Sequence, residues 1–337
     1  MKQHNRNDFD VTVIADSKNQ FGDRVTSLLV TLPRIVLAEL NTHRMFSRNS
    51  ASSRAIPFNK MVKTIEEHPF VPIAWQKNHK GMQGTEYLSL VEDIYPPGDW
   101  LEGRDKMIET AKKLHADGVT KQLCNRLLEP FMWQTVLITA SEWENFFNLR
   151  CSQYNINGTK FRSKKDAIKQ YPNDIKYDSV LDWLQINESQ AEIHIQKAAE
   201  MIWDRMNESE PKKLEAEQWH VPFCDNINDD IILQKLAKEE EIKHLDSTFD
   251  IYQFYAIKIA TARSARTSYL NFEGKDDYSK DIELHDNLLK YMHLSPFEHC
   301  CVVPTEKDYN LALKGKEKGW FDNFHGFISY RYMLRSN

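Results

Sequence analysis

Two stretches near the start of the chain alternate apolar and polar residues, a pattern typical of β-strands. They cover residues 11–15 and 24–30, and a polar stretch with Asn19 and Gly22 separates them as a turn. Pro33 then begins a helical spacing of apolar residues, because proline is favoured in the first turn of a helix. The pattern therefore predicts two strands joined by a turn and followed by a helix.

Helical spacing of apolar residues dominates the rest of the chain. The predicted helices cover residues 105–126, 143–149, 189–206, 233–243, 252–265 and 281–292, and strand signals return near residue 135. Two stretches break this pattern. The proline-rich 56–103 is predicted to form loops and short helices, and the Lys-, Asp- and Asn-rich 155–182 is predicted to be an inserted loop or small excursion. Strand and helix do not alternate as in a parallel α/β sheet. We therefore predict an α+β fold, helix-rich around a mixed or antiparallel sheet.

The composition is typical of a soluble globular protein. The chain has 337 residues, of which 41% are hydrophobic, and a formal net charge of -5 at pH 7, which does not favour nucleic-acid binding. Its apolar runs fall far short of the roughly 20 residues that a membrane-spanning helix needs. The first residues are polar, so we expect no signal peptide. The five cysteines form no CxxC pair, which favours a reducing, cytoplasmic location.

Residues 42–54 have the most unusual composition, with three arginines, one histidine, four serines and one asparagine. Guanidinium groups bind phosphate oxygens in a forked geometry, and hydroxyl and backbone N–H groups add further donors. This segment is therefore a candidate anion-binding site. The alternative is a solvated loop that follows a helix.

A second candidate is Arg150, which ends an apolar run and is expected to be buried. A buried arginine needs an anionic partner or a bound ligand, because an unpaired charge is unfavourable inside a protein. The alternative is an internal salt bridge, for example with Glu142 or Glu192.

Metal and nucleophile chemistry receive little support from the sequence. His293, Glu298 and His299 include metal-ligand residue types, but their spacing differs from HExxH, so we predict a hydrogen-bonding loop and no metal. Most of the cysteines lie in apolar surroundings, where a thiol is usually inert. Ser52 has arginine beside it rather than a base, which disfavours a serine hydrolase.

Six motifs in the chain resemble those of the flavin-dependent thymidylate synthases. The family's Arg-His-Arg signature, with the Ser-x-Asn, Ser and Arg that follow it, is similar to residues His43, Arg44, Ser47, Asn49, Ser52 and Arg54. Residues 145–150 resemble the family's Asn-Phe-Leu-Asn-Leu-Arg, and the other motifs are at 125–130, 190–193, 265–269 and 293–299. In the family the last two motifs precede Arg-His-Arg. The chain thus resembles a circular permutation, which is tolerated where the original termini lie close together.

The resemblance implies one domain over residues 1–337 with the fold of the family and insertions near 56–103 and 155–182. It also implies an FAD-dependent methyltransferase that converts dUMP to dTMP, with methylenetetrahydrofolate as carbon donor and NADPH as reductant. The implied partners are this nucleotide and the folate, bound by a homotetramer whose active site is shared between subunits. The family uses no protein nucleophile.

Carried over position by position, the resemblance implies two groups of site residues. The group implied for flavin binding is His43, Arg44, Asn49, Asn145, Ser268, His293, Ser295 and Glu298. The group implied for nucleotide binding is Glu39, Ser52, Arg54, Arg126 and Arg150. Arg150 and Ser52 are also the catalytic candidates, and a guanidinium against the base would stabilise negative charge that develops on the uracil.

Four positions depart from the family pattern and bear on the product. Thr42, Glu39, Ser50 and Ala55 stand where the family has Arg, Gln, Glu and Tyr, respectively. The departures leave two alternatives open. One is a hydroxymethylase of dUMP or dCMP, in which water adds to the transferred carbon, and the other is a non-catalytic relative that binds nucleotide.

Overall fold

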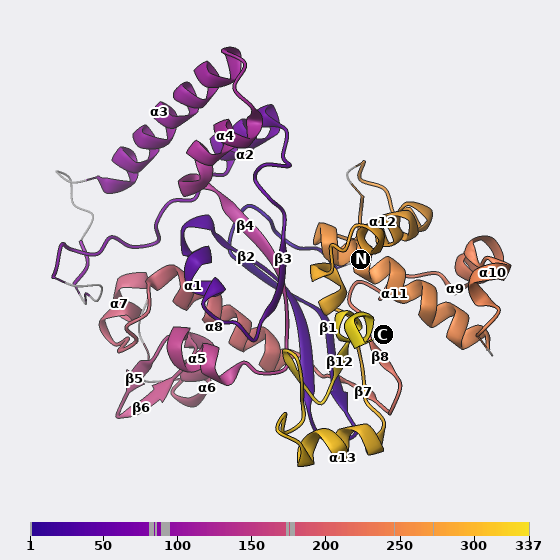
Figure 1. Ribbon diagram of the computed structural model, residues 1–337. Helices are drawn as coiled ribbons and strands as arrows, with labels where there is room; N and C mark the ends of the chain where they lie inside the picture. Colours follow the sequence, from indigo (N-terminus) through magenta and orange to yellow (C-terminus); the bar gives the residue numbers. More distant parts are fainter. Residues whose placement is uncertain are drawn as a thin grey trace.

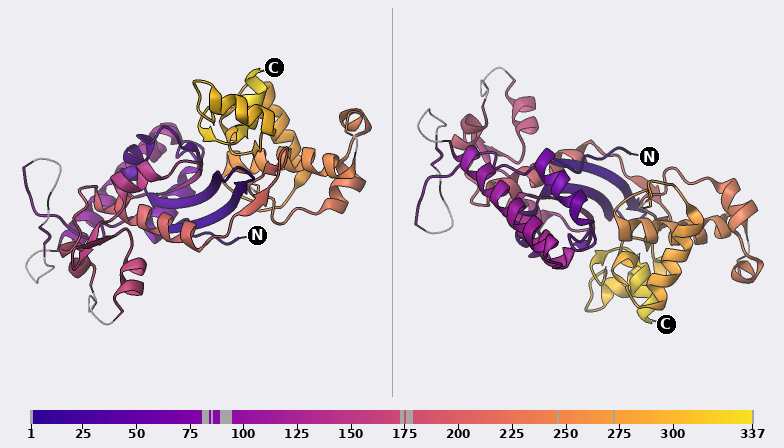
Figure 2. Two further views of the ribbon diagram at one scale, coloured as in Figure 1. Left: turned by 90° about the horizontal axis from the view of Figure 1, so that it is seen from below. Right: turned by 90° about the horizontal axis from the view of Figure 1, so that it is seen from above.

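The computed structural model describes residues 2–80, 84, 86–88, 95–172, 175, 179–245, 247–271 and 273–336. The fold is α+β and helix-rich around a mixed sheet, which confirms the predicted class. The sheet lies in the middle of an elongated molecule (Figures 1 and 2). The C-terminal third, in orange and yellow, gathers at one end of the sheet, and the purple and magenta helices gather at the other.

The central sheet begins with the two predicted strands, which form a hairpin. β1 (Asp10–Asn19) pairs antiparallel with β2 (Arg24–Pro33), and β2 pairs antiparallel with β4 (Trp133–Ala140). β3 (Ser47–Ser50) pairs with β4 at one edge, and β7 (Lys212–Leu214) joins β1 in parallel at the other. The strand order is therefore β3-β4-β2-β1-β7.

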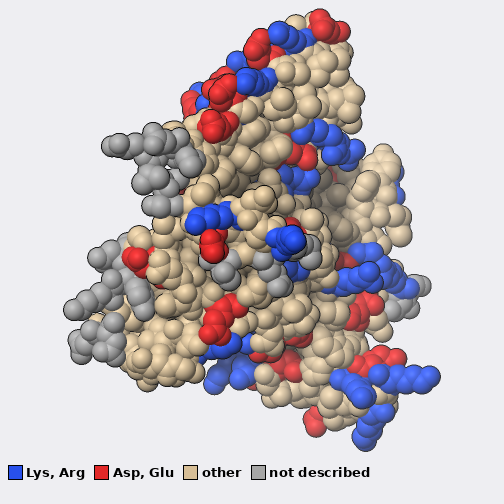
Figure 3. Space-filling view, turned by 90° about the vertical axis from the view of Figure 1, so that its left-hand side faces the viewer, with Lys and Arg blue, Asp and Glu red and all other residues tan. Residues whose placement is uncertain are grey.

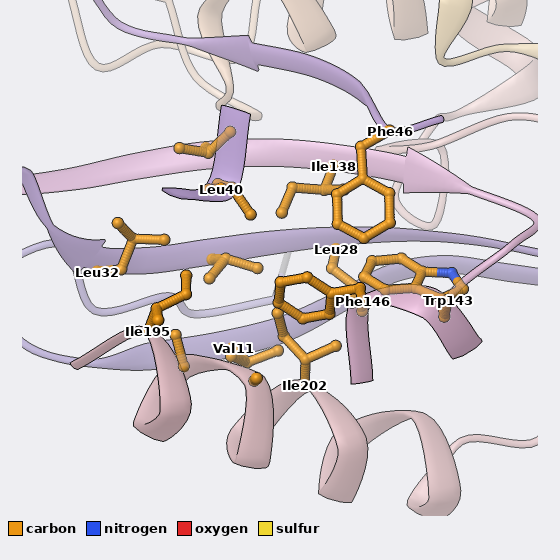
Figure 4. Packing of buried hydrophobic residues seen from close by; sticks show 14 of the residues in the cluster. Val11, Leu28, Leu32, Leu40, Phe46, Ile138, Trp143, Phe146, Ile195 and Ile202 are labelled. Carbon is orange, nitrogen blue, oxygen red and sulfur yellow. The ribbon is translucent and has the colours of Figure 1, made fainter. Parts of the chain in front are cut away.

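The main core lies between this sheet and α8 (Ile193–Glu208). Alternate residues of a strand share one face of a sheet, so Leu28 and Leu32 of β2 point toward α8 together. Figure 4 shows these side chains against Ile195 and Ile202 of α8. The helices α1 (Leu37–Asn41) and α5 (Glu144–Arg150) close the core with the residues Leu40, Phe146 and, from the segment before α5, Trp143.

A second core lies among the helices at the upper end of Figure 1. It is built by α2 (Phe58–Glu67), α3 (Pro96–Ala116), α4 (Lys121–Cys124) and the 3₁₀ segment η2 (Asn125–Phe131). Acidic and basic side chains alternate along the upper edge of Figure 3, where α3 lies. Within the described ranges, no helix has the length and apolar character that a membrane crossing requires.

The C-terminal third contains two long helices and a small sheet. α11 (Thr248–Arg266) packs against α12 (Tyr278–Lys290), and the 3₁₀ turn η4 (Ser295–Glu298) follows. The small sheet consists of β8 (Trp219–His220), β9 (Cys301–Val302) and β12 (Ile328–Ser329), in the order β12-β9-β8.

The other elements of the described chain are short. They are η1 (Arg34–Val36), β5 (Tyr154–Ile156), β6 (Thr159–Phe161), α6 (Lys164–Gln170), α7 (Val180–Gln185), α9 (Asp229–Ile231), the π-helical η3 (Ile232–Leu236), α10 (Glu239–Ile242), α13 (Glu306–Lys314), β10 (Trp320–Phe321), β11 (Phe324–His325) and α14 (Tyr330–Ser336).

Several predicted bounds are wrong, for local physical reasons. The helix predicted at 105–126 ends ten residues early as α3, because the chain turns at Gly118, whose φ of +84° favours glycine. The helix predicted at 233–243 is divided between η3 and α10. The stretch 155–182 contains a hairpin and two short helices rather than a plain loop, and its residues 173–174 and 176–178 lie outside the described residues. The same holds for 81–83, 85 and 89–94 of the stretch 56–103.

A chain of buried polar side chains crosses the sheet on the face opposite α8. His220 bonds with Ser17 Oγ through Nδ1 and with Ser27 Oγ through Nε2, each at 2.8 Å. Ser27 and Thr139, which are register partners on β2 and β4, bond at 2.6 Å, and Thr139 bonds with His299 Nδ1 at 2.8 Å. Burial lowers the pKa of His220 to about 4 and that of His299 to about 3, so both rings are neutral near pH 7.

The neutral state of these two rings makes stability depend on pH. A histidine whose folded pKa is depressed binds more protons when unfolded, so its stabilising contribution is lost as pH falls below about 6.5. Between pH 7 and pH 5 the free energy of unfolding should fall by about 2 kcal/mol for each ring. Urea titrations at the two pH values measure this slope, and His220→Gln should have a shallower one. An equal slope in wild type and variant would contradict the prediction.

Candidate functional site

Segments from opposite ends of the chain meet at the sheet edge formed by β3. Ser295 Oγ, at the start of η4, donates a hydrogen bond of 2.5 Å to Asn49 Oδ1 on β3. β3 is an edge strand because only β4 pairs with it, which leaves its other side to η4. Two of the residues implied for flavin binding are therefore in direct contact, although 246 positions separate them.

Glu298 lies at the end of η4 between two arginines. Arg331 of α14 donates a hydrogen bond to Glu298 Oε1 through Nη1. Arg48 of β3 donates to the backbone oxygen of Leu40 at 3.0 Å, and burial lowers the pKa of this guanidinium while the charge of Glu298 raises it. The carboxylate of Glu298 is therefore held in place from the C-terminal helix and faces positive charge from β3.

His43 and Arg150 form the second contact between predicted site residues. Arg150, at the end of α5, donates from Nε to His43 Nε2 at 3.2 Å and from Nη2 to Thr42 Oγ1 at 3.2 Å. Phe146 contacts the His43 ring edge-on at 4.9 Å. Burial first, and then the charges of Arg150 and Arg48, lower the pKa of His43 to about 4, so the ring is neutral near pH 7 and Nε2 can accept.

The structure corrects the prediction for Arg150. Its side chain is partly exposed rather than buried, and no ion pair involves it among the described residues. Glu142 instead accepts from the backbone N–H of Asn145, and Glu192 caps the N-terminus of α8, so the proposed internal salt bridge is wrong. A neutral imidazole and a hydroxyl orient the guanidinium without neutralising its charge, which leaves the charge available to a ligand.

A third set of predicted site residues lies near an open pocket of about 470 Å³ beside α1. Arg34, Arg126 and Glu129 form part of the lining of this pocket. Ser53 Oγ donates to Glu129 Oε1 at 2.6 Å, and Asn125 Nδ2 donates to the backbone oxygen of Ser53 at 2.8 Å. These bonds fix the loop that follows β3 against η2.

The same bonds bring three of the predicted nucleotide-binding residues onto neighbouring segments. Ser52 and Arg54 flank Ser53, and Arg126 follows Asn125. All three side chains are exposed, and Arg54 Nε donates to Ser52 Oγ at 3.4 Å. Two exposed guanidinium groups and a hydroxyl on adjoining segments can bind an anion.

Other predicted site residues have no such contacts. The side chains of Arg44, Asn145 and His293 are exposed and make no hydrogen bond or ion pair within the described part of the chain. Ser268 accepts from the backbone N–H of Leu270 in the turn after α11. Glu39 on α1 is partly buried, and its Oε2 atom is buried without a hydrogen-bond partner among the described residues.

Sequence reasoning missed the residues that hold the predicted ones in place. Arg331 lies outside all six motifs, so no motif indicated its contact with Glu298. The hydrogen bonds that Asn125 makes through its side chain were also missed, although Asn125 begins the motif at 125–130. The available signal was an asparagine directly before a predicted ligand, Arg126.

Metal ligation has no geometric support among the residues described. No group of three potential ligands comes together there, and the Glu298 and His299 side chains bond to Arg331 and Thr139.

Four of the five cysteine thiols are poorly suited to act as nucleophiles. Burial raises the pKa of Cys300 to about 12 and raises the pKa values of Cys151, Cys224 and Cys301 as well. Because the thiolate is the reactive form, these side chains are packing residues.

The family that the sequence resembles uses no protein nucleophile, so if the chain has the family's activity on dUMP, single Cys→Ser replacements should leave its turnover nearly unchanged. We expect losses of about 1–3 kcal/mol in the free energy of unfolding at the buried positions, because a hydroxyl replaces a packed thiol. Turnover and thermal unfolding of each variant are the measurements. A folded variant that binds nucleotide but has no turnover would contradict the prediction.

Comparison with solved structures gives distant likenesses only. The UMP/dUMP methylase PolB from Streptomyces cacaoi bound with 5-Br UMP is 14% identical, with a TM-score of 0.38 over 60% of this chain and 90% of that one. The same methylase bound with 5-Br dUMP is 13% identical, with a TM-score of 0.40 over 60% and 92%. Likenesses this weak carry no functional argument. No family model and no curated protein matches the chain.

Proposed function

We propose that the chain is an FAD-dependent enzyme that methylates dUMP to dTMP, with methylenetetrahydrofolate as carbon donor and NADPH as reductant. The observation that supports this most is the contact between Asn49 and Ser295. The two residues belong to different motifs of the flavin-dependent thymidylate synthases, and both are implied to bind the flavin. A permuted member of that family requires this meeting of chain ends, whereas unrelated segments do not.

The residues around β3 and η4 fit a flavin. The Arg44 and His293 side chains are exposed and have no partners in the described part of the chain, so their donors are free for a ligand. Arg331 Nε is buried without a hydrogen-bond partner there. Asn49, Ser295 and Glu298 add an amide, a hydroxyl and a carboxylate on the same surface. FAD, when bound, supplies the hydride that reduces the transferred carbon.

Arg150 is proposed to bind the pyrimidine ring and to stabilise negative charge on it. His43 and Thr42 hold two of its guanidinium nitrogens, which orients the remaining donors. A preoriented charge needs little reorganisation when charge develops on the substrate, and this lowers the reaction barrier. Ser52, Arg54 and Arg126 are proposed to bind the nucleotide phosphate at the rim of the pocket beside α1.

The exposure of the site in one chain agrees with a site completed by a second copy. Arg44, Asn145 and His293 face solvent rather than an enclosed pocket, and a flavin ring needs to be shielded from water for hydride transfer. We therefore propose a homo-oligomer, of the tetrameric kind that the family forms.

Visible spectroscopy and product analysis test this function together. Purified protein mixed with FAD should show the flavin absorbance, which NADPH should bleach, and dUMP with methylenetetrahydrofolate should give dTMP by mass spectrometry. A product heavier than dTMP by one oxygen would identify the hydroxymethylase. Protein that binds no flavin even at excess FAD would overturn the proposal, whereas nucleotide binding without turnover would indicate the non-catalytic relative.

The unpaired Glu39 oxygen favours dCMP as a second candidate substrate. Glu39 stands where the family has Gln, and its Oε2 atom is buried without a partner among the described residues. A carboxylate accepts from the amino group of cytosine, which uracil lacks. If dCMP is the substrate, Glu39→Gln should shift kcat/KM from dCMP toward dUMP.

Removal of either phosphate-binding arginine should weaken nucleotide binding. Charge-assisted hydrogen bonds contribute about 1.5–3 kcal/mol, so Arg54→Ala and Arg126→Ala should each raise the Kd for dUMP at least about tenfold. Isothermal titration measures this, and flavin content should stay unchanged. Arg104→Ala is the control, because Arg104 pairs with Asp105 on α3. Unchanged affinity in both variants would mean that the phosphate binds elsewhere.

A further inference from the structure

A cavity of about 150 Å³ lies between α8 and the inserted segment that contains β5, α6 and α7. The elements β5, α6 and α7 lie in the lower left part of Figure 1. The apolar part of its lining, the apolar wall, includes Ile73, Val180, Leu184, Ile193 and Met201. The polar part, the polar wall, includes Tyr154, Lys164 and Glu200. The lining thus combines aliphatic and polar side chains.

The acidic groups of the polar wall already have partners. Glu200 accepts from Tyr154 Oη at 2.9 Å, from Ser152 Oγ at 3.4 Å and from the backbone N–H of Lys164 at 2.8 Å. Asp204 accepts from the Ser163 side chain. Burial raises the pKa values of Glu200 and Asp204, which reduces the negative charge that these groups place on the cavity.

The ammonium group of Lys164 is a donor of the cavity lining that lacks an acceptor among the described residues. Its Nζ lies 6.0 Å from the ring centre of Tyr154 and 5.6 Å from that of Trp183, and it makes no hydrogen bond or ion pair among the described residues. Burial lowers the pKa of Lys164, which reflects poor hydration of the charge. An acceptor that enters the cavity would satisfy this group.

We propose that the cavity binds a small aliphatic monocarboxylate, with its carboxylate on Lys164 Nζ and its hydrocarbon chain against the apolar wall. The volume holds a molecule of about six non-hydrogen atoms, the size of butyrate. Phosphate, which has no hydrocarbon chain, would leave the apolar wall without a contact. The site is separate from the proposed nucleotide and flavin site, so its test needs neither ligand.

Butyrate is the probe, and its binding to the full chain is followed by NMR of the lysine Cε resonances and by calorimetry. We expect a Kd in the millimolar range and a shift of the Lys164 resonance with the same midpoint. Lys164→Met keeps the length of the side chain and removes the charge, and it should weaken binding at least about tenfold. Lys165→Met is the matched control, because Lys165 is on the same helix but pairs with Glu208 at the surface.

Two further ligands test the two parts of the proposal separately, namely the contact of the carboxylate with Lys164 and the contact of the hydrocarbon chain with the apolar wall. 1-Butanol, which keeps the chain and lacks the charge, should bind at least about tenfold more weakly than butyrate. Inorganic phosphate should not displace butyrate. The proposal is overturned if the Lys164 resonance does not respond to butyrate, if both lysine variants bind equally well, or if phosphate competes. The NMR titration uses the wild-type chain, so an unfolded variant would not prevent a decision.

Discussion

Arg150→Met should lower kcat for dUMP by about 10²–10³, because removing one preoriented donor from a site of developing charge typically has this effect. The side chain is partly exposed and pairs only with neutral groups in the described structure, so its loss should leave the fold intact. Arg150→Lys should recover little, because an ammonium cannot contact His43, Thr42 and a base at the same time. Steady-state kinetics with a thermal unfolding curve for each variant give the result.

Arg205→Met is the control for this experiment, because Arg205 is an exposed arginine of α8 that pairs with Glu208 and donates to the backbone oxygen of Val11, away from the residues predicted for the site. Its kcat should equal that of the wild type. If Arg150→Met raises only KM, Arg150 binds the nucleotide without stabilising charge in the reaction. A variant of Arg150 with wild-type kcat would remove it from the catalytic site.

Asp281→Asn should lower the free energy of unfolding by about 3–5 kcal/mol, which is the usual effect of leaving a buried charge unpaired. The Asp281 carboxylate is fully buried on α12 and bonds to two arginines of α11. Arg263 Nε lies 3.3 Å from Oδ2, and Arg266 Nη1 lies 2.5 Å from Oδ1. Without the charge of Asp281, both guanidinium groups stay buried and Arg266 loses its ionic partner.

Asp276→Asn provides the comparison, because Asp276 pairs with Arg263 at 2.7 Å but its side chain is 27% exposed. Water can replace part of this interaction, so we expect a loss of about 1 kcal/mol. Urea unfolding of both variants measures the difference. Equal losses would show that the buried position of Asp281 does not matter.

The strands that the sequence predicted well are those with a local signal. β1 and β2 alternate apolar and polar residues, and their pairing follows from the short turn between them. β3 has the polar sequence Ser47–Ser50, and it forms because β4 offers a free edge, which only the tertiary fold provides. Intrinsic propensity is a weak guide where pairing decides the conformation.

The sequence predicted which residues belong to the candidate site, but it predicted few of the contacts between them. The motifs named His43 and Arg150, but the hydrogen bond between them depends on how α5 packs under the segment after α1. They also named Glu298, but its contact with Arg331 joins two segments of unrelated pattern. Periodicity and spacing describe neighbours along the chain. The order of the motifs and the single-domain organisation stay predictions from the resemblance.

The bond between Asn49 and Ser295 has a consequence for synthesis of the protein on the ribosome. Its two residues are 246 positions apart, and Arg331, which holds Glu298, lies still further along the chain. The core between the sheet and α8 can form while the chain is still growing, because its residues precede position 210. Until the C-terminal segment emerges, β3 is an uncovered strand edge, the kind of surface that pairs with other chains. A nascent chain that stalls before residue 295 would therefore have a folded core, no η4 beside β3 and an exposed edge prone to aggregation.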